Sequence, residues 1–243
     1  MEEKEWFADW FDTSFYHILY QDRNEAEAKR FIDALLHFLK LPNQSSLLDL
    51  ACGKGRHALT LHEHGHDVLG VDLSKKSILH AKKFKKSGLD FAVHDMREVL
   101  EGKSFDAIFN LFTSFGYFDS VQENEKVCKA IFEVLKPGGR LVIDFMNAEK
   151  VIDNLVLEEH KLRNSIDFEI ARRFDGSHII KDIRFSHDSK DFCFTERVQA
   201  INKIQFLELL EPYFVVDSIF GSFALEDYIP STSDRLIIIA TRK

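Results

Sequence analysis

The sequence of 243 residues has few cysteines, no long apolar run and no excess of positive charge. Its three cysteines, Cys52, Cys128 and Cys193, lie far apart, which fits neither a disulfide framework nor the spacing of zinc ligands. The N-terminus has no basic flank before an apolar stretch, and no run of about 18 apolar residues could cross a membrane. We therefore expect a soluble, cytoplasmic protein with no membrane association and no metal site.

Positive charge is also scarce: 32 lysines and arginines face 40 aspartates and glutamates, a net charge of −8. No overall positive field would draw this chain to a phosphate backbone, so we do not expect a nucleic-acid partner. Six lysines between Lys75 and Lys86 are best explained as the solvated face of a helix. With 45% hydrophobic and 30% charged residues, the composition is that of a globular protein.

The first part of the chain alternates between strand and helix patterns. Helical spacing of apolar residues runs from Asn24 to Lys40, where Pro42 follows. Further helices are predicted at 56–64, where Gly65 follows, at 75–86 with Ser74 as N-cap, and at 123–135. Short apolar runs between them predict strands at 47–50, 68–73, 90–94, 105–111 and 140–145. Strands alternating with helices predict a mostly parallel, doubly wound sheet.

A different pattern follows. Between Ser165 and Ala200, three segments alternate polar and apolar residues, with turns at Asp175-Gly176 and Asp188-Ser189, which predicts an antiparallel meander. A helix at 203–210 and strands at 213–220 and 235–240 would complete the sheet. We predict one α/β domain with seven strands: an N-terminal segment (1–23), a core (24–158 and 201–243) and an antiparallel β insertion (159–200).

The most informative stretch runs from Leu47 to Ala58. A strand enters small residues and then a helix, so the backbone can approach a ligand and free N–H groups at the helix N-terminus can face it. Asp72, at the end of the next strand, is placed to accept hydrogen bonds from both hydroxyls of a ribose. Together these features predict a nucleotide-like ligand.

Two kinds of ligand fit the glycines. Gly53, Gly55 and Ala58 satisfy the G-x-G-x-x-G/A pattern of dinucleotide sites, which would permit NAD. Asp49 argues against NAD, because a dinucleotide-binding strand is apolar up to its first glycine and a buried carboxylate is costly. Asp49 could order the loop by accepting its N–H groups, or act through water on a cationic ligand tail.

These residues resemble the first motif of the class I S-adenosylmethionine-dependent methyltransferases, an Asp or Glu followed by x-Gly-x-Gly-x-Gly. Ala51 replaces the first glycine, and Gly53 and Gly55 keep the other two. The resemblance continues to Asn147: Asp72 matches the ribose position and Asp95-Met96 the adenine position. Two later segments, Phe105 to Leu111 and Leu135 to Leu141, are similar to the family's fourth-strand motif and its Leu-Lys-Pro-Gly-Gly turn.

The resemblance implies S-adenosyl-L-methionine as cofactor, S-adenosyl-L-homocysteine as product and in-line methyl transfer to an acceptor. Leu73 and Met96 would cover the adenine while Asp95 accepts from its amino group. The predicted cofactor-binding residues are Tyr20, Asp49, Ala51, Cys52, Gly53, Gly55, Asp72, Leu73, Asp95, Met96, Asn110 and Leu111.

The N-terminal segment is rich in aromatic residues: Trp6, Phe7, Trp10, Phe11, Phe15, Tyr16 and Tyr20. It is either a helix packed on the core or a lid that closes over the cofactor, with Tyr16 or Tyr20 taking part and Arg23 near the cofactor carboxylate. The run Thr113 to Phe118 would line the acceptor side. No catalytic residue is assigned, because His17, His57, His94 and Tyr117 are equal candidates for a general base.

We expect a small-molecule acceptor, with the insertion as a cap over its pocket. Eight basic and eight acidic residues between Glu159 and Ala200 balance each other, unlike the basic face of an RNA-modifying enzyme. The alternatives are an RNA or protein methyltransferase, or a protein that binds S-adenosylmethionine without transferring its methyl group. The sequence leaves the acceptor atom open, and it is compatible with a monomer or a homodimer.

Overall fold

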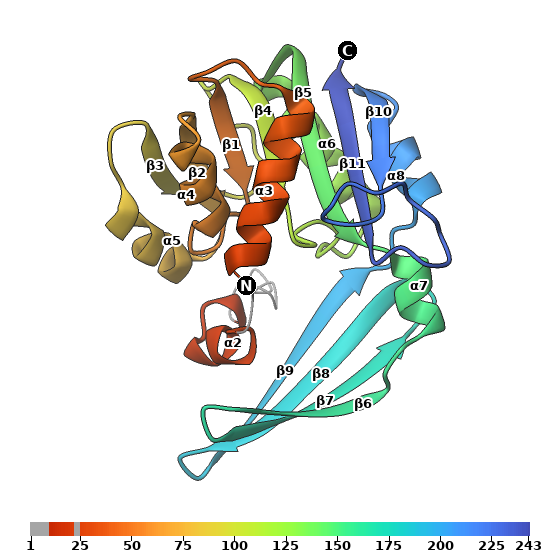
Figure 1. The fold of residues 1–243 in the computed structure, drawn as a ribbon. Coiled ribbons are helices and arrows are strands. Elements are labelled where there is room, and N and C mark those ends of the chain that lie inside the picture. The colour runs from red at the N-terminus through yellow and green to blue at the C-terminus, as the bar shows by residue number, and fades with distance from the viewer. Residues whose placement is uncertain (1–9, 22–24) are drawn as a thin grey trace.

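The computed structural model describes residues 10–21 and 25–243, and it contains two β-sheets (Figure 1). Trp6, Phe7 and Arg23, named above as parts of the N-terminal segment, lie outside the described residues.

The larger sheet has seven strands in the order β10-β11-β5-β4-β1-β2-β3. Strands β1 to β5 are mutually parallel where they pair, and β11 is antiparallel to both of its neighbours. This is the predicted doubly wound, mostly parallel sheet. Its strands are β1 (Ser46–Leu50), β2 (Asp67–Asp72), β3 (Leu89–Val93), β4 (Phe105–Asn110), β5 (Leu135–Met146), β10 (Phe214–Phe220) and β11 (Arg235–Arg242).

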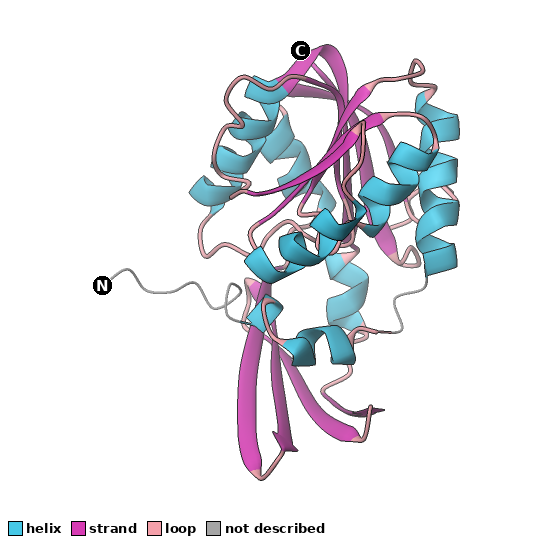
Figure 2. Cartoon of the chain, turned by 90° about the vertical axis from the view of Figure 1, so that its left-hand side faces the viewer, coloured by secondary structure: helices cyan, strands magenta, loops and turns pink. Residues whose placement is uncertain are grey.

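Helices cover both faces of this sheet (Figure 2). Successive strand residues point to opposite faces, so Leu47 packs with one layer of helices and Leu48 with the other. The first layer is α3 (Glu25–Leu39), α4 (Arg56–Glu63) and α5 (Lys75–Ala81); the second is α6 (Val121–Val134) and α8 (Lys203–Leu210). In the part of the chain that the structure describes, no helix is long and apolar enough to span a membrane.

Some boundaries differ from the sequence prediction. The helix expected to reach Lys86 ends at Ala81 and continues as a short 3₁₀ helix, η1 (Lys82–Phe84), because Lys86 pairs with Leu89 at the start of β3. The pairing of β4 with β5 shifts between Phe105 and Ala107, so the Pro-Gly-Gly residues form an irregularity inside β5 and not a separate turn. A short helix, α7 (Ala148–Asp153), was not predicted.

The insertion is a second sheet of four antiparallel strands in the order β6-β7-β8-β9. Three of them, β7 (Ile166–Phe174), β8 (His178–His187) and β9 (Lys190–Gln199), were predicted. The edge strand β6 (Glu158–Arg163) was missed because its side chains are mostly charged and only half of its positions are shielded. Figure 1 shows this small sheet extending from the end of the molecule where β1 to β5 have their carboxyl ends.

Residues 10–21, which we call the aromatic segment, contain the helix α2 (Ser14–Leu19) and pack on the small sheet. Trp10 is buried and stacks on Phe194 with ring centroids 4.4 Å apart. Phe15 contacts Phe185 and Phe192. The sheet thus has its own small core, separate from the two layers that cover the seven-stranded sheet.

Candidate functional site

A cavity of about 500 Å³ lies at the carboxyl ends of β1, β2, β3 and β4. In open α/β sheets ligands bind at this edge, where the direction of strand order reverses between β1 and β4. The loops after these strands, one side of α5 and the aromatic segment form the cavity wall. A volume of this size is ordinary for a small-molecule or cofactor site.

The loop between β1 and α4 is tightly turned. Ala51, Gly53 and Gly55 all have positive φ angles, of 64°, 55° and 85°. A Cβ atom at Gly55 would lie 2.6 Å from the Phe91 ring, so this glycine permits close packing behind the loop. At Gly53 a Cβ atom would meet no atom within 4 Å, so the backbone there borders open space. The loop therefore presents bare backbone to the cavity.

Asp49 lies behind this loop and outside the cavity wall. Its side chain is buried, and its Oδ2 accepts a hydrogen bond of 2.9 Å from the N–H of Ala58 in the first turn of α4. Burial raises the pKa of Asp49 to about 7. This hydrogen bond orders the start of α4, and the action of Asp49 through water on a ligand stays a prediction.

Asp72 lies at the end of β2 and lines the cavity. Its two oxygens accept hydrogen bonds of 2.8 Å each, one from the N–H of Gly53 and one from the N–H of Ser74. Burial raises the pKa of this carboxyl. Each carboxylate oxygen has a second lone pair, so Asp72 can still accept from two ligand hydroxyls.

The predicted adenine residues come together in the cavity wall. Leu73, Asp95 and Met96 all line it. Arg97 binds Asp95 through its backbone N–H and its guanidinium, at 2.6 to 3.2 Å. Burial opposes ionisation of Asp95, but these hydrogen bonds prevail and lower its pKa. Asp95 is therefore an ionised acceptor held in one orientation.

Asn110, which was predicted to bind the cofactor, lies behind the cavity wall. This side chain is fully buried at the end of β4, is absent from the cavity wall, and donates a hydrogen bond of 3.1 Å to the carbonyl of Leu50. Its role in the structure is to tie β4 to the end of β1. Leu111, the next residue, does line the cavity.

The chain after β4 takes an unusual course. Phe112 and Thr113 both have left-handed backbones, with φ angles of 66° and 60°. The N–H of Phe112 donates to Asp144 Oδ2 at 2.8 Å, and the N–H of Thr113 donates to the Asp144 carbonyl at 2.9 Å. Arg235 donates to Asp144 Oδ1 at 2.7 Å and to the Thr113 hydroxyl at 3.1 Å. This arrangement fixes the Phe112 ring in the cavity wall.

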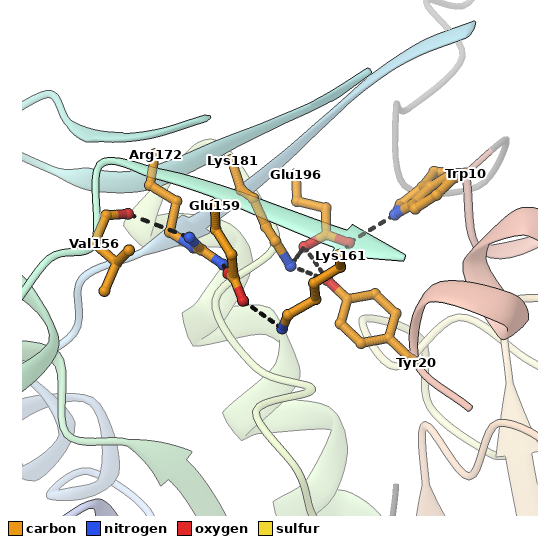
Figure 3. A network of polar contacts seen from close by, with 8 residues as sticks. All are labelled: Trp10, Tyr20, Val156, Glu159, Lys161, Arg172, Lys181 and Glu196. Carbon is orange, nitrogen blue, oxygen red and sulfur yellow. Dashed lines mark hydrogen bonds and ion pairs between the residues drawn. The ribbon is translucent and has the colours of Figure 1, made fainter. Parts of the chain in front are cut away.

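The aromatic segment contributes Phe11, Tyr16, His17, Tyr20 and Gln21 to the cavity wall. The segment packs mainly on the small sheet and lines part of the cavity, and its role as a lid over the cofactor stays a prediction. The Tyr20 hydroxyl, however, donates to Glu196 of β9 at 2.8 Å (Figure 3). The hydroxyl proton of Tyr20 is therefore engaged by Glu196.

The small sheet contributes no residue to the cavity wall in the described part of the chain. The insertion was expected to cap the acceptor pocket, and this role stays a prediction. Strands β6 to β9 hold the aromatic segment, which lines the cavity.

Nine of the twelve predicted cofactor-binding residues line the cavity; Asp49, Gly55 and Asn110 lie behind it. The four candidate bases, His17, His57, His94 and Tyr117, all line it as well, as do Ser114, Tyr117 and Phe118 of the run expected on the acceptor side. Sequence reasoning missed the wall residues Lys54, Arg56, Ser77, His80, Phe84 and Phe112. Helical spacing of Ser77, His80 and Phe84 would have revealed the face that α5 and η1 turn toward the cavity.

Residues 47–139 match the protein family described as "Methyltransferase domain". Over 134 residues, 53% of this chain, the sequence is 33% identical to dTDP-3-amino-3,4,6-trideoxy-alpha-D-glucopyranose N,N-dimethyltransferase of Streptomyces venezuelae. That match covers 54% of the relative, so this chain spans about half the length of the curated relatives it matches.

Solved structures resemble the whole described fold. An S-adenosylmethionine-dependent methyltransferase from Clostridium acetobutylicum superposes with a TM-score of 0.79 at 20% identity, over 93% of this chain and 96% of that one. CalS10, an amino pentose methyltransferase from Micromonospora echinaspora with S-adenosylmethionine bound, gives 0.73 at 20% identity, over 95% and 98%. These likenesses establish the Rossmann-like methyltransferase fold. Together with the match of residues 47–139 to the methyltransferase domain, they make this chain similar in domain and fold to the class I S-adenosylmethionine-dependent methyltransferases.

Proposed function

We propose that this protein transfers a methyl group from S-adenosylmethionine to a small-molecule acceptor. The observation that carries the proposal is the position of Asp72, whose carboxylate lies in the cavity wall at the end of β2, hydrogen-bonded to the N–H of Gly53. A ribose acceptor beside bare loop backbone is what a nucleoside cofactor requires. The match of residues 47–139 to the methyltransferase domain supports the same cofactor.

The residues of the cavity fit this cofactor. Asp72 would bind the ribose hydroxyls, Leu73 and Met96 the faces of the adenine, and Asp95 its amino group. Lys54 and Arg56 lie in the wall next to the glycine loop, where a cation can meet the cofactor carboxylate. When bound, the cofactor supplies an electrophilic methyl group on a sulfonium. The protein lowers the barrier by aligning the acceptor and excluding water.

An amine is the acceptor group that we propose. Two of the similar proteins described above are named as methyltransferases of amino sugars. One is the N,N-dimethyltransferase of Streptomyces venezuelae and the other is CalS10. The wall is rich in aromatic rings, including Phe11, Tyr16, Tyr20 and Tyr117, which attract a cationic amine and its methylated product. An ammonium acceptor must lose a proton before transfer, and His17, His57, His94 and Tyr117 remain the candidates to accept it.

We also propose that the protein works in the cytoplasm. Cys52, Cys128 and Cys193 are all free thiols in the structure, and Cys193 is exposed, which suits a reducing compartment. Cell fractionation of the tagged full chain tests this location.

Calorimetry tests the cofactor. We expect the protein to bind S-adenosylmethionine and S-adenosylhomocysteine but not NAD. The variant Asp72→Ala lacks the carboxylate that would accept hydrogen bonds from the ribose hydroxyls. It should bind S-adenosylhomocysteine about tenfold or more weakly, because hydrogen bonds to a charged group are strong. The matched control is Asp67→Ala, at the other, exposed end of β2, which should bind as the wild type does.

Two results would contradict the proposal. Binding of NAD alone would indicate a dinucleotide enzyme, and unchanged affinity in the folded Asp72→Ala variant would show that the ribose lies elsewhere. Methyl transfer from labelled S-adenosylmethionine to a panel of small amines, alcohols and thiols then identifies the acceptor group. If the protein binds the cofactor but methylates no compound of this panel, the proposed activity is contradicted and the proposed cofactor is not.

A further inference from the structure

The aromatic segment is attached to the protein on two sides of the cavity. On one side, the Ser74 hydroxyl, at the N-cap of α5 and two residues from Asp72, donates a hydrogen bond to Asp12. On the other side, Trp10 and Tyr20 bind Glu196 in the small sheet. Phe11 and Tyr16, between these attachments, line the cavity, and Tyr20 lines it as well.

Glu196 interacts with three donor groups, two from the aromatic segment and one from β8 (Figure 3). The indole N–H of Trp10 lies 2.7 Å from Oε1, the Tyr20 hydroxyl lies 2.8 Å from both carboxylate oxygens, and Lys181 Nζ on β8 lies 3.3 Å from Oε2. Lys181 also donates to the Tyr20 hydroxyl. Trp10 is 1% exposed and the Glu196 side chain 13%, so these are shielded, charge-assisted bonds.

A second group of charges extends this polar patch on the same face of the sheet. Glu159 binds Arg172 and Lys161, the latter at 3.1 Å (Figure 3). Farther along, the face becomes apolar, with Phe168, Ile170 and Ile183 buried in the small core. Apolar packing alone does not fix how a helix is rotated or shifted on a sheet, whereas a carboxylate with directed donors does.

Tyr20 contacts both the small sheet and the cavity. Its hydroxyl is hydrogen-bonded to Glu196 of the small sheet, and the residue also lines the cavity. Burial and the nearby Glu196 raise the Tyr20 pKa, so the hydroxyl remains a donor. The position of the ring, and of Tyr16 with which it is in contact at 4.9 Å between centroids, thus depends on a bond to the small sheet.

We propose that Glu196 is a positioning residue, which holds the aromatic segment over the cofactor cavity through Trp10 and Tyr20. The small sheet then shapes the cavity without contributing to its wall. The inference rests on the proposed function insofar as the cavity binds the cofactor; the attachment of the segment to Glu196 does not depend on it.

Tryptophan emission and ligand affinity test the proposal together. With Trp6→Phe as the background, Trp10 is the sole tryptophan of the chain. Glu196→Ala should shift Trp10 emission to the red, increase its quenching by acrylamide, and weaken S-adenosylhomocysteine binding by about tenfold, the loss of roughly one charged hydrogen bond. The matched control is Asp182→Asn, which removes a carboxylate that binds Arg173 and Thr195 on β7 and β9 and makes no bond to the aromatic segment. It should change neither reading.

Glu196→Ala leaves the Lys181 charge without its partner carboxylate, which can destabilise the fold. A second, milder variant is therefore included. Tyr20→Phe keeps the ring, the Trp10 bond and the Lys181 pair, and removes only the hydroxyl. It should change both readings in the same direction, with affinity lowered by about threefold or more, and it decides the question if Glu196→Ala does not fold.

Unchanged emission or unchanged affinity in folded Glu196→Ala and Tyr20→Phe would overturn the proposal. If the wild type binds no S-adenosylhomocysteine, the proposed function fails. Trp10 emission in the variants then still decides whether Glu196 holds the segment.

Discussion

At the scale of single residues, Ala51 shows why the first position of the loop motif favours glycine. Its φ of 64° lies in the left-handed region, where a Cβ atom crowds the following carbonyl. Alanine is small, so the size of its side chain does not exclude it from this position. The structure shows that the requirement at this position is conformational, and size does not relieve it.

Ala51→Gly should therefore stabilise the protein. Relief of the left-handed strain, about 1 to 2 kcal/mol, exceeds the extra backbone entropy that glycine loses on folding, about 0.5 to 1 kcal/mol. We expect a gain of up to about 1 kcal/mol in the free energy of unfolding, measured by urea titration. The control is Ala58→Gly, in the first turn of α4, which should destabilise. A loss of stability in Ala51→Gly would mean that its side chain makes contacts worth more than the strain.

At the scale of elements, one buried ion pair connects three parts of the chain. Asp144 on β5 has no exposed surface and binds Arg235 on β11 as well as the loop that follows β4. Burial raises the Asp144 pKa, although Arg235 opposes this rise. The pair holds Phe112 and Thr113 in left-handed conformations, which cost energy unless the surroundings enforce them.

Removing one partner of this pair should be costly. Arg235→Met leaves the Asp144 carboxylate buried without its cation, and we expect a loss of about 3 to 5 kcal/mol in the free energy of unfolding. The neighbouring pair of Lys150 and Asp234 serves as the control, because Asp234 is 83% exposed at its side chain. Asp234→Asn should cost less than about 1 kcal/mol. Equal losses in the two variants would show that the buried pair adds nothing beyond a surface contact.

At the scale of the whole molecule, Asp49 makes the stability of the fold depend on pH. Its pKa is about 7 in the folded protein, against an ordinary value of 3.8. Between these pH values the folded state holds a proton that the unfolded state has released. The contribution of Asp49 therefore lowers stability as the pH rises through this window, by up to about 1.4 kcal/mol per pH unit, and is constant above it.

Asp49→Asn isolates this contribution, because asparagine keeps an acceptor for the Ala58 N–H and carries no charge. The variant minus wild-type difference in the free energy of unfolding should increase from pH 4.5 to pH 7, and then level off. Denaturant titrations at several pH values measure it, and other titrating groups cancel in the comparison. A difference that does not change with pH would show that Asp49 is ionised throughout.

The sequence by itself determined the fold and most of the cavity. Strand and helix periodicities follow directly from which side chains must be buried, and the carboxyl ends of parallel strands share one edge of the sheet. Residues at the ends of successive strands, such as Asp72 and Met96, were therefore expected near one another, and both line the cavity.

Only the tertiary structure decided which of these residues reach the cavity and what surrounds it. Asn110 lies one residue before the cavity wall, and its side chain ties two strands together behind it. The pairs of Asp144 with Arg235 and of Tyr20 with Glu196 join residues 91 and 176 positions apart. No local pattern records such contacts, because they depend on how whole elements pack. For the same reason, the sequence did not show that the small sheet packs against the aromatic segment, which lines the cavity.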